Sequence, residues 1–197
     1  MKNWIILIIA LLFYQNIIIS QQAQLLMDIN PGKESSFEFS TDRLYIEYQD
    51  KLFFVARSAE EGLELWQYDG QNVSLFMDIN PGPKSSNVDN FYILNNQLVF
   101  IADDGKHGTE WWISDGTPAG TRMIVDLLEG PKGGAINCCN GESGRSIIVY
   151  NDELYFNANI NSLENRLYKT DGTAEGTKEL AMLNGSQRTA SSAPRTK

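Results

Sequence analysis

The sequence of 197 residues is 42% hydrophobic and 11% aromatic, a composition typical of a globular protein and not of a disordered one. Its formal net charge is −9 at pH 7, and an acidic surface repels nucleic acid and anionic lipid, because binding of phosphates requires clustered Lys or Arg. We therefore expect neither nucleic acid nor an anionic membrane surface as a partner.

The first 20 residues have the pattern of a secretory signal peptide. Lys2 precedes an apolar run over residues 4–14, and Ser20 follows just before a polar stretch. The run is shorter than the roughly 20 residues that span a bilayer. We therefore expect residues 1–20 to be a signal, cleaved near Ser20 or Ala23, and the mature protein to be secreted or at the cell surface, without a membrane partner. An uncleaved anchor is the alternative if residues 15–19 are counted with the run.

One motif, an aromatic residue three positions before an Asp-Gly turn, occurs three times. The three copies span Glu64–Gly70, Glu110–Thr117 and Arg166–Thr173. Their aromatic residues lie 46 positions apart (66 to 112) and 56 apart (112 to 168). Periods of this size indicate solenoids, arrays or propellers.

Two further kinds of segment recur around this motif. The octad Leu25–Gly32 returns almost unchanged as Leu75–Gly82 and more weakly at 123–130, and each copy reads as a short strand stopped by turn residues. Two-residue Asn/Asp turns follow an aromatic-rich strand and precede an apolar strand, which is a hairpin signal. These turns are Gln49-Asp50, Asn95-Asn96 and Asn151-Asp152.

Each unit thus contains four short strands in up-and-down order, and no helical period appears outside the signal. We predict an all-β fold in which four-stranded antiparallel blades repeat about three times, as in an incomplete or open β-propeller. The predicted repeat region is 21–185, with units at about 25–73, 74–121 and 122–183. Residues 186–197 are small, polar and basic, and we expect a disordered tail there.

The motif copies resemble the ELWxxDGT repeat family, on the strength of the segment Glu110–Thr117, the Ala119-Gly120-Thr121 that follows it, and the repeated Asp-Ile-Asn-Pro-Gly octads. This resemblance covers roughly residues 25–183. It implies a secreted or surface repeat protein of hyalin-like type with a propeller-like fold, and it supplies no catalytic residues. The sequence departs from the family pattern at Gln71, Arg166 and Tyr168.

Two groups of polar residues are candidates for a functional site. Oxygen ligands for calcium are offered by Asp28, Asn30, Asp78, Asn80, Asp103 and Asp104. No loop matches an EF-hand, and Asp or Asn before Gly or Pro is usually a turn former. The segment 103–108 also brings carboxylates close to His107, the single His of the chain, as a hydrolase requires, but it lies in a linker that every unit has. We therefore predict turns and a solvated loop, with no metal, no cofactor and no catalytic residue.

Three other features leave alternatives open. Trp66, Trp112 and Tyr168 occupy equivalent positions, where packing between blades is favoured over a sugar-stacking row. The adjacent Cys138 and Cys139 are free thiols, a strained vicinal disulfide or an intermolecular link. They lie in the Gly-rich insertion 131–145, where a binding loop is expected. Asn72 and Asn184 begin glycosylation sequons, which matter only in a eukaryotic secretory host.

The sequence therefore predicts a non-catalytic extracellular repeat module for protein or glycan binding or for surface structure. Its expected partners are another copy, another repeat protein paired through open blade edges, or an extracellular protein or glycan. The alternatives are a secreted propeller enzyme acting on polysaccharide, which needs converging carboxylates, and a truncated fragment of a larger surface repeat protein.

Overall fold

The computed structural model describes residues 25–32, 35–37, 45–135, 147–161 and 164–182. This part of the chain is all-β and has no helix, and so no helix that is long and apolar enough to span a membrane. Three four-stranded antiparallel sheets follow one another along the chain, each with its strands in sequence order. The first contains β1 (Tyr45–Tyr48), β2 (Lys51–Ser58), β3 (Gly62–Tyr68) and β4 (Val73–Met77). The second contains β5 (Asp89–Leu94), β6 (Gln97–Asp103), β7 (Thr109–Ser114) and β8 (Arg122–Met123). The third contains β9 (Ile148–Tyr150), β10 (Glu153–Asn161), β11 (Glu164–Thr170) and β12 (Lys178–Met182).

The first two strands of every sheet form the hairpin that the sequence predicts. All six residues of the turns Gln49-Asp50, Asn95-Asn96 and Asn151-Asp152 have positive φ, between 49° and 59°. Two consecutive positive φ values define a type I′ turn, whose twist matches that of the flanking strands. Asn and Asp adopt this conformation more readily than other non-glycine residues, which explains why they dominate these positions.

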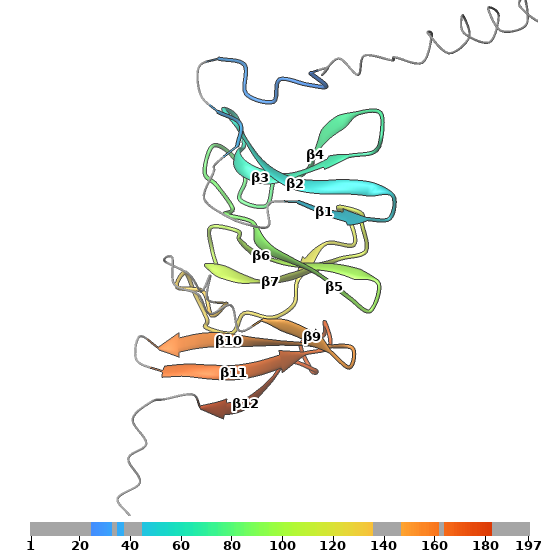
Figure 1. Ribbon diagram of the computed structural model, residues 1–197. Helices are drawn as coiled ribbons and strands as arrows, with labels where there is room; N and C mark the ends of the chain where they lie inside the picture. Colours follow the sequence, from blue (N-terminus) through green and yellow to red (C-terminus); the bar gives the residue numbers. More distant parts are fainter. Residues whose placement is uncertain (1–24, 33–34, 38–44, 136–146, 162–163, 183–197) are drawn as a thin grey trace, which may run out of the picture.

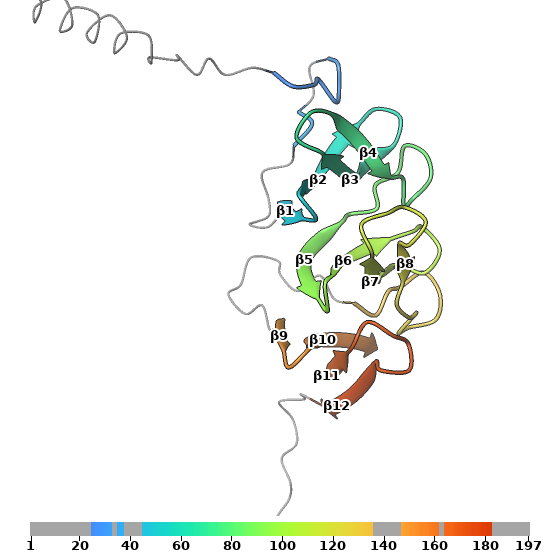
Figure 2. The same ribbon diagram turned by 90° about the vertical axis from the view of Figure 1, so that its right-hand side faces the viewer.

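The three sheets are stacked face to face, with the first strands β1, β5 and β9 along one side and β4, β8 and β12 along the other (Figures 1 and 2). We call the face of each sheet that is turned toward the preceding unit its front face, and the opposite face its back face. The back face of the first sheet, with Phe53, Val55 and Leu65, packs on the front face of the second. The back face of the second sheet, including Trp111, packs on the front face of the third, and the rings of Trp111 and Phe156 lie 5.3 Å apart.

The middle sheet is therefore covered on both faces, as its continuous apolar runs predict. Its front face presents Leu98, Phe100 and Trp112 to the first sheet, and both Leu98 and Phe100 are fully buried. Most of the core consists of these two interfaces between sheets.

The hydrogen-bonded sheets are shifted by one strand relative to the sequence units. The predicted units 25–73, 74–121 and 122–183 begin at the octad, but the octad strand β4 pairs with β3 and so closes the sheet that precedes it. Residues 25–27, which copy this strand, have no strand partner in the described chain and form no strand. The octad is thus the last strand of one sheet together with the connector to the next.

Several predictions concern residues outside the described part of the chain. These are the signal at 1–20, the tail at 186–197, the pair Cys138 and Cys139, and Asn184.

Candidate functional site

A buried glutamate fixes the connector between the first and second sheets. Glu64 lies on β3 and is fully buried. Its Oε1 accepts a hydrogen bond from the Ser86 amide (2.8 Å), and its Oε2 accepts bonds from the Ile79 amide (2.9 Å) and the Ser86 hydroxyl (2.6 Å). Burial raises the pKa of Glu64 to about 7, against the lowering effect of the bonds from Ser86 and Ile79. The carboxyl thus holds both ends of the connector that leads from β4 to β5.

Glu110 takes the same role one unit later. It is fully buried on β7, and the backbone amides of Gly134, Leu127 and Leu128 face its carboxyl. Burial raises its pKa to about 7 as well, while those amides act in the opposite direction. The third unit carries Arg166 at this position, where its guanidinium pairs with Glu179 at 2.7 Å within the same sheet.

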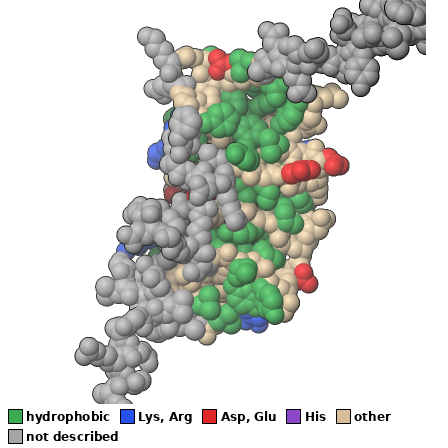
Figure 3. Space-filling view, in the orientation of Figure 1, with side chains coloured by type: hydrophobic (Ala, Val, Ile, Leu, Met, Phe, Trp, Pro, Cys, Tyr) green, Lys and Arg blue, Asp and Glu red, His purple; other side chains and the backbone are tan. Residues whose placement is uncertain are grey.

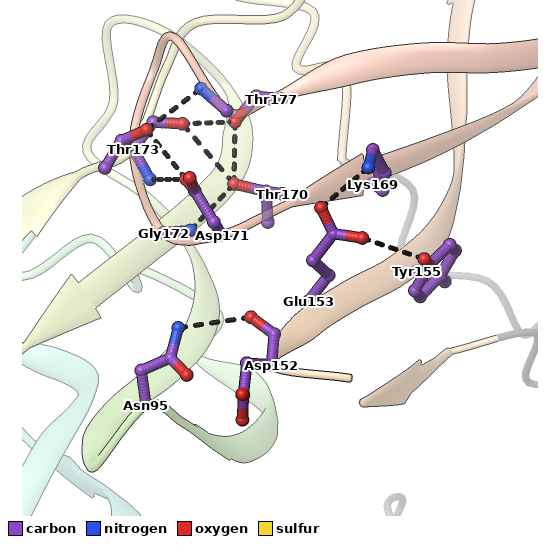
Figure 4. A network of polar contacts seen from close by, with 11 residues as sticks. Asn95, Asp152, Glu153, Tyr155, Lys169, Thr170, Asp171, Gly172, Thr173 and Thr177 are labelled. Carbon is purple, nitrogen blue, oxygen red and sulfur yellow. Dashed lines mark hydrogen bonds and ion pairs between the residues drawn. The ribbon is translucent and has the colours of Figure 1, made fainter. Parts of the chain in front are cut away.

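The Asp-Gly-Thr part of the motif is a self-contained turn. In the third unit, Oδ1 of Asp171 accepts bonds from the amide (2.9 Å) and the hydroxyl (2.7 Å) of Thr173. The hydroxyls of Thr170 and Thr177 lie 2.7 Å apart and close the loop from inside (Figure 4). The second unit repeats the same set of bonds around Asp115. The recurring Asp and Thr side chains are therefore bonded to their own loop.

The residues considered as calcium ligands, which the sequence predicts to form turns, contact backbone groups. Oδ2 of Asp78 accepts from the Gly82 amide (3.1 Å), and Oδ1 of Asp103 accepts from the Gly105 amide (2.7 Å). The Asn80 amide donates to the Ser85 carbonyl (3.2 Å). In the described ranges, no group of three or more His, Cys, Asp or Glu side chains is arranged to hold a metal ion. Asp28 is exposed, whereas Asn30 is buried like Asn80.

His107 and Asp104 form a local pair in the loop before β7. Nδ1 of His107 lies 2.8 Å from Oδ2 of Asp104, and Oδ1 of Asp104 accepts from the amides of Lys106 and His107. Burial acts to raise the pKa of Asp104, but the bonds from His107 and Lys106 outweigh it and lower that pKa. The carboxylate thus caps its own turn, in agreement with the predicted loop.

The three aromatic residues of the motif lie on front faces. Trp112 is packed between the first two sheets, where its Nε1 donates to the Ala102 carbonyl (3.2 Å), and Tyr168 is packed between the second and third. Trp66 is only 5% exposed on the front face of the first sheet. The prediction of packing positions is therefore confirmed for Trp112 and Tyr168.

A hollow of about 420 Å³ lies on the front face of the first sheet. It is almost entirely apolar and is lined by Leu25, Leu26, Met27, Ile29, Phe37, Tyr45, Leu52, Phe54, Tyr68 and Val73. Leu52 is 39% exposed here, whereas Leu98 and Leu154, at the same position of the next two sheets, are fully buried. No other described sheet covers this face, and we take the hollow as the candidate binding site.

Further apolar side chains are exposed along the first strands of the sheets. Hydrophobic side chains appear on the face seen in Figure 3 from the first sheet to the third. The most exposed large ones on these strands are Tyr45 at 69%, Ile148 at 60% and Tyr150 at 61%. Tyr45 joins this row to the hollow.

Sequence reasoning missed both the hollow and the two buried glutamates. The available signal for the glutamates was the repetition of Glu at 64 and 110, in both copies two positions before a Trp. The hollow had no comparable signal, because Leu52 belongs to an apolar run that looks the same in all three units.

No protein-family model, curated protein or solved structure matches this chain.

Proposed function

We propose that this protein is a non-catalytic extracellular repeat module that binds other proteins, built as an open, propeller-like stack of blades of the ELWxxDGT type. The observation that carries the proposal is the apolar hollow on the front face of the first sheet, since at both internal junctions the same face is an interface. An exposed apolar surface of this kind marks a protein interaction site. A glycan site presents more polar groups than this lining offers.

The recurring residues support a scaffold in preference to an enzyme. A glycosidase needs two carboxylates that reach the scissile bond. Glu64 and Glu110 have the raised pKa that a general acid requires, but both are fully buried and each is bonded to its own connector. A polysaccharide therefore has no access to either carboxyl in this conformation.

Site-specific photo-crosslinking tests the proposal. A photoreactive amino acid replaces Leu52 in the hollow, and a matched control carries it at the exposed Glu129 in the connector after the second sheet. In the cells that produce the protein, we expect a discrete protein adduct from position 52 and none from position 129. Equal labelling at both positions, or release of reducing sugar from polysaccharide by the purified protein, would contradict the proposal.

A further inference from the structure

The residues before the first sheet repeat the structure of the connector between the first two sheets. We call residues 25–32 and 35–37 the N-terminal connector. Ile29 packs on Phe54 and Trp66 of the first sheet as Ile79 packs on the front face of the second. Asn30 and Asn80 are both 8% exposed. The correspondence therefore extends beyond the sequence to burial and to the face that is covered.

A backbone hydrogen bond is repeated as well. The Ser36 carbonyl accepts from the Arg57 amide at 2.7 Å, and the Ser86 carbonyl accepts from the Asp103 amide at 2.8 Å. Arg57 and Asp103 occupy the same position on the second strands of their sheets. The N-terminal connector is thus docked on the first sheet in the way that the internal connector is docked on the second.

The buried carboxyl that holds the connector between the first two sheets has no counterpart among the described residues at the N-terminal connector. Glu64, from the third strand of the preceding sheet, accepts the amides of Ile79 and Ser86. Among the described residues, none accepts a hydrogen bond from the corresponding amides of Ile29 and Ser36. In the described part of the chain, residues 25–27 likewise have no strand beside them, whereas their copy in β4 pairs with β3.

We propose that the front face of the first sheet and the N-terminal connector are the docking site for a further repeat unit on a partner protein. The partner contributes three antiparallel strands and the chain contributes residues 25–27 as the fourth. The back face of the incoming unit covers Leu52 and Tyr68, and a Glu on its third strand accepts the amides of Ile29 and Ser36. This inference rests on the proposed function as a protein-binding repeat module.

The third sheet of a second copy does not fit this description. It carries Arg166 where the site requires Glu, and that guanidinium is already paired with Glu179. Its fourth strand is also already in place as β12. The partner is therefore a unit with the Glu-x-Trp pattern of the first two motif copies.

An extended protein tests the proposal. A second copy of residues 45–74 replaces residues 1–24, so that the copied Ser74 precedes Leu25 as the native Ser74 precedes Leu75. The reference is the chain starting at Leu25, and a control carries Glu64→Ala in the copied segment alone. Hydrogen exchange is measured at the amides of Ile29 and Ser36.

We expect exchange at both amides to slow by at least about tenfold in the extended protein, and to return toward the reference rate in the control, because protection follows the hydrogen-bonded, closed state. Unchanged exchange at Ile29 and Ser36, with the core amide of Phe100 still protected, would overturn the proposal. If Phe100 loses protection, the extended protein is not folded as intended. A second extended protein, in which residues 89–122 are joined to Leu25, is then tested by the same exchange measurement at Ile29 and Ser36.

Light scattering of the reference chain tests whether a second copy of the chain occupies the site instead. A dimer of the reference chain that disappears on extension would assign the face to a second copy and overturn the partner proposed here. All these measurements use purified protein, so they can fail while position 52 still crosslinks to a protein in cells, and the two proposals are tested separately.

Discussion

Removal of the Glu64 carboxyl should strongly destabilise the junction of the first two sheets. In Glu64→Ala, the amide of Ile79 loses its acceptor, while the amide and the hydroxyl of Ser86 keep the Leu63 carbonyl, at 3.1 and 3.2 Å. Each buried donor left without a partner costs about 1–3 kcal/mol. We expect a loss of about 1–3 kcal/mol in the free energy of unfolding at pH 5, a sizeable fraction of the stability of a typical domain.

The loss should be smaller at pH 8. The pKa of Glu64 is raised from 4.5 to about 7 by folding, so the native state binds this proton more tightly than the unfolded state. The resulting stabilisation is fully present below about pH 4.5 and is lost as the pH rises through 7. For such a shift, the free energy of unfolding of the wild type falls by an amount on the order of 2 kcal/mol between pH 5 and pH 8. The Ala variant lacks this group, so its free energy of unfolding should not show this fall.

Urea unfolding of wild type and variant at both pH values measures these differences through the midpoint, provided that the slope with denaturant is unchanged. Ser86→Ala and the double variant complete a cycle, in which we expect a coupling energy above about 0.5 kcal/mol because the two side chains are in contact. A loss below about 1 kcal/mol at pH 5, or an equal loss at pH 5 and pH 8, would refute the assigned role of the buried carboxyl.

Three further outcomes are expected. Gly62→Ala should cost at least about 1 kcal/mol more than Gly70→Ala in chemical denaturation: both glycines have positive φ, 74° and 92°, but only at Gly62 would a Cβ meet backbone atoms, those of Lys84 at 2.7 and 2.8 Å, and equal losses would show that the close contact has no effect. Asp171→Ala should lower stability by about 1 kcal/mol through loss of the two bonds to Thr173, whereas a melting temperature equal to that of wild type would show that the turn does not need its cap. Intact-mass measurement of the protein recovered from the culture medium should find a chain beginning near residue 21 or 24, and a full-length mass would contradict the predicted signal.

Local signals account for most of the fold that the sequence could predict. A two-residue polar turn that contains Asn or Asp between apolar strands defines a hairpin by itself, and all three such turns join a pair of antiparallel strands as predicted. The repeated Asp-Gly-Thr segments are likewise closed by bonds among their own residues. Neither feature depends on how the sheets are arranged.

The features that could not be predicted depend on non-local contacts. A periodic sequence has no intrinsic origin, so the repeat alone does not indicate at which of its four strands a hydrogen-bonded sheet begins. Glu64 occupies a position in β3 at which period-2 alternation cannot distinguish a solvated carboxylate from a buried one. Its partners, Ile79 and Ser86, follow 15 and 22 residues later, and only folding brings them to it.

The two ends of the stack are chemically different, and the proposed docking of a partner unit therefore has a direction. The front face of the first sheet is apolar and already carries a docked connector. The back face of the third sheet instead has Asn157 where the preceding sheets have Val55 and Ile101, and nearby Glu153 and Lys169 form an ion pair at 2.6 Å. Covering that face would remove the side chains of Asn157, Glu153 and Lys169 from water, and burial of polar and charged groups costs free energy. We therefore expect a partner unit to add at the first sheet in preference to the third, because there burial of apolar surface coincides with two amides, those of Ile29 and Ser36, that no described residue accepts from.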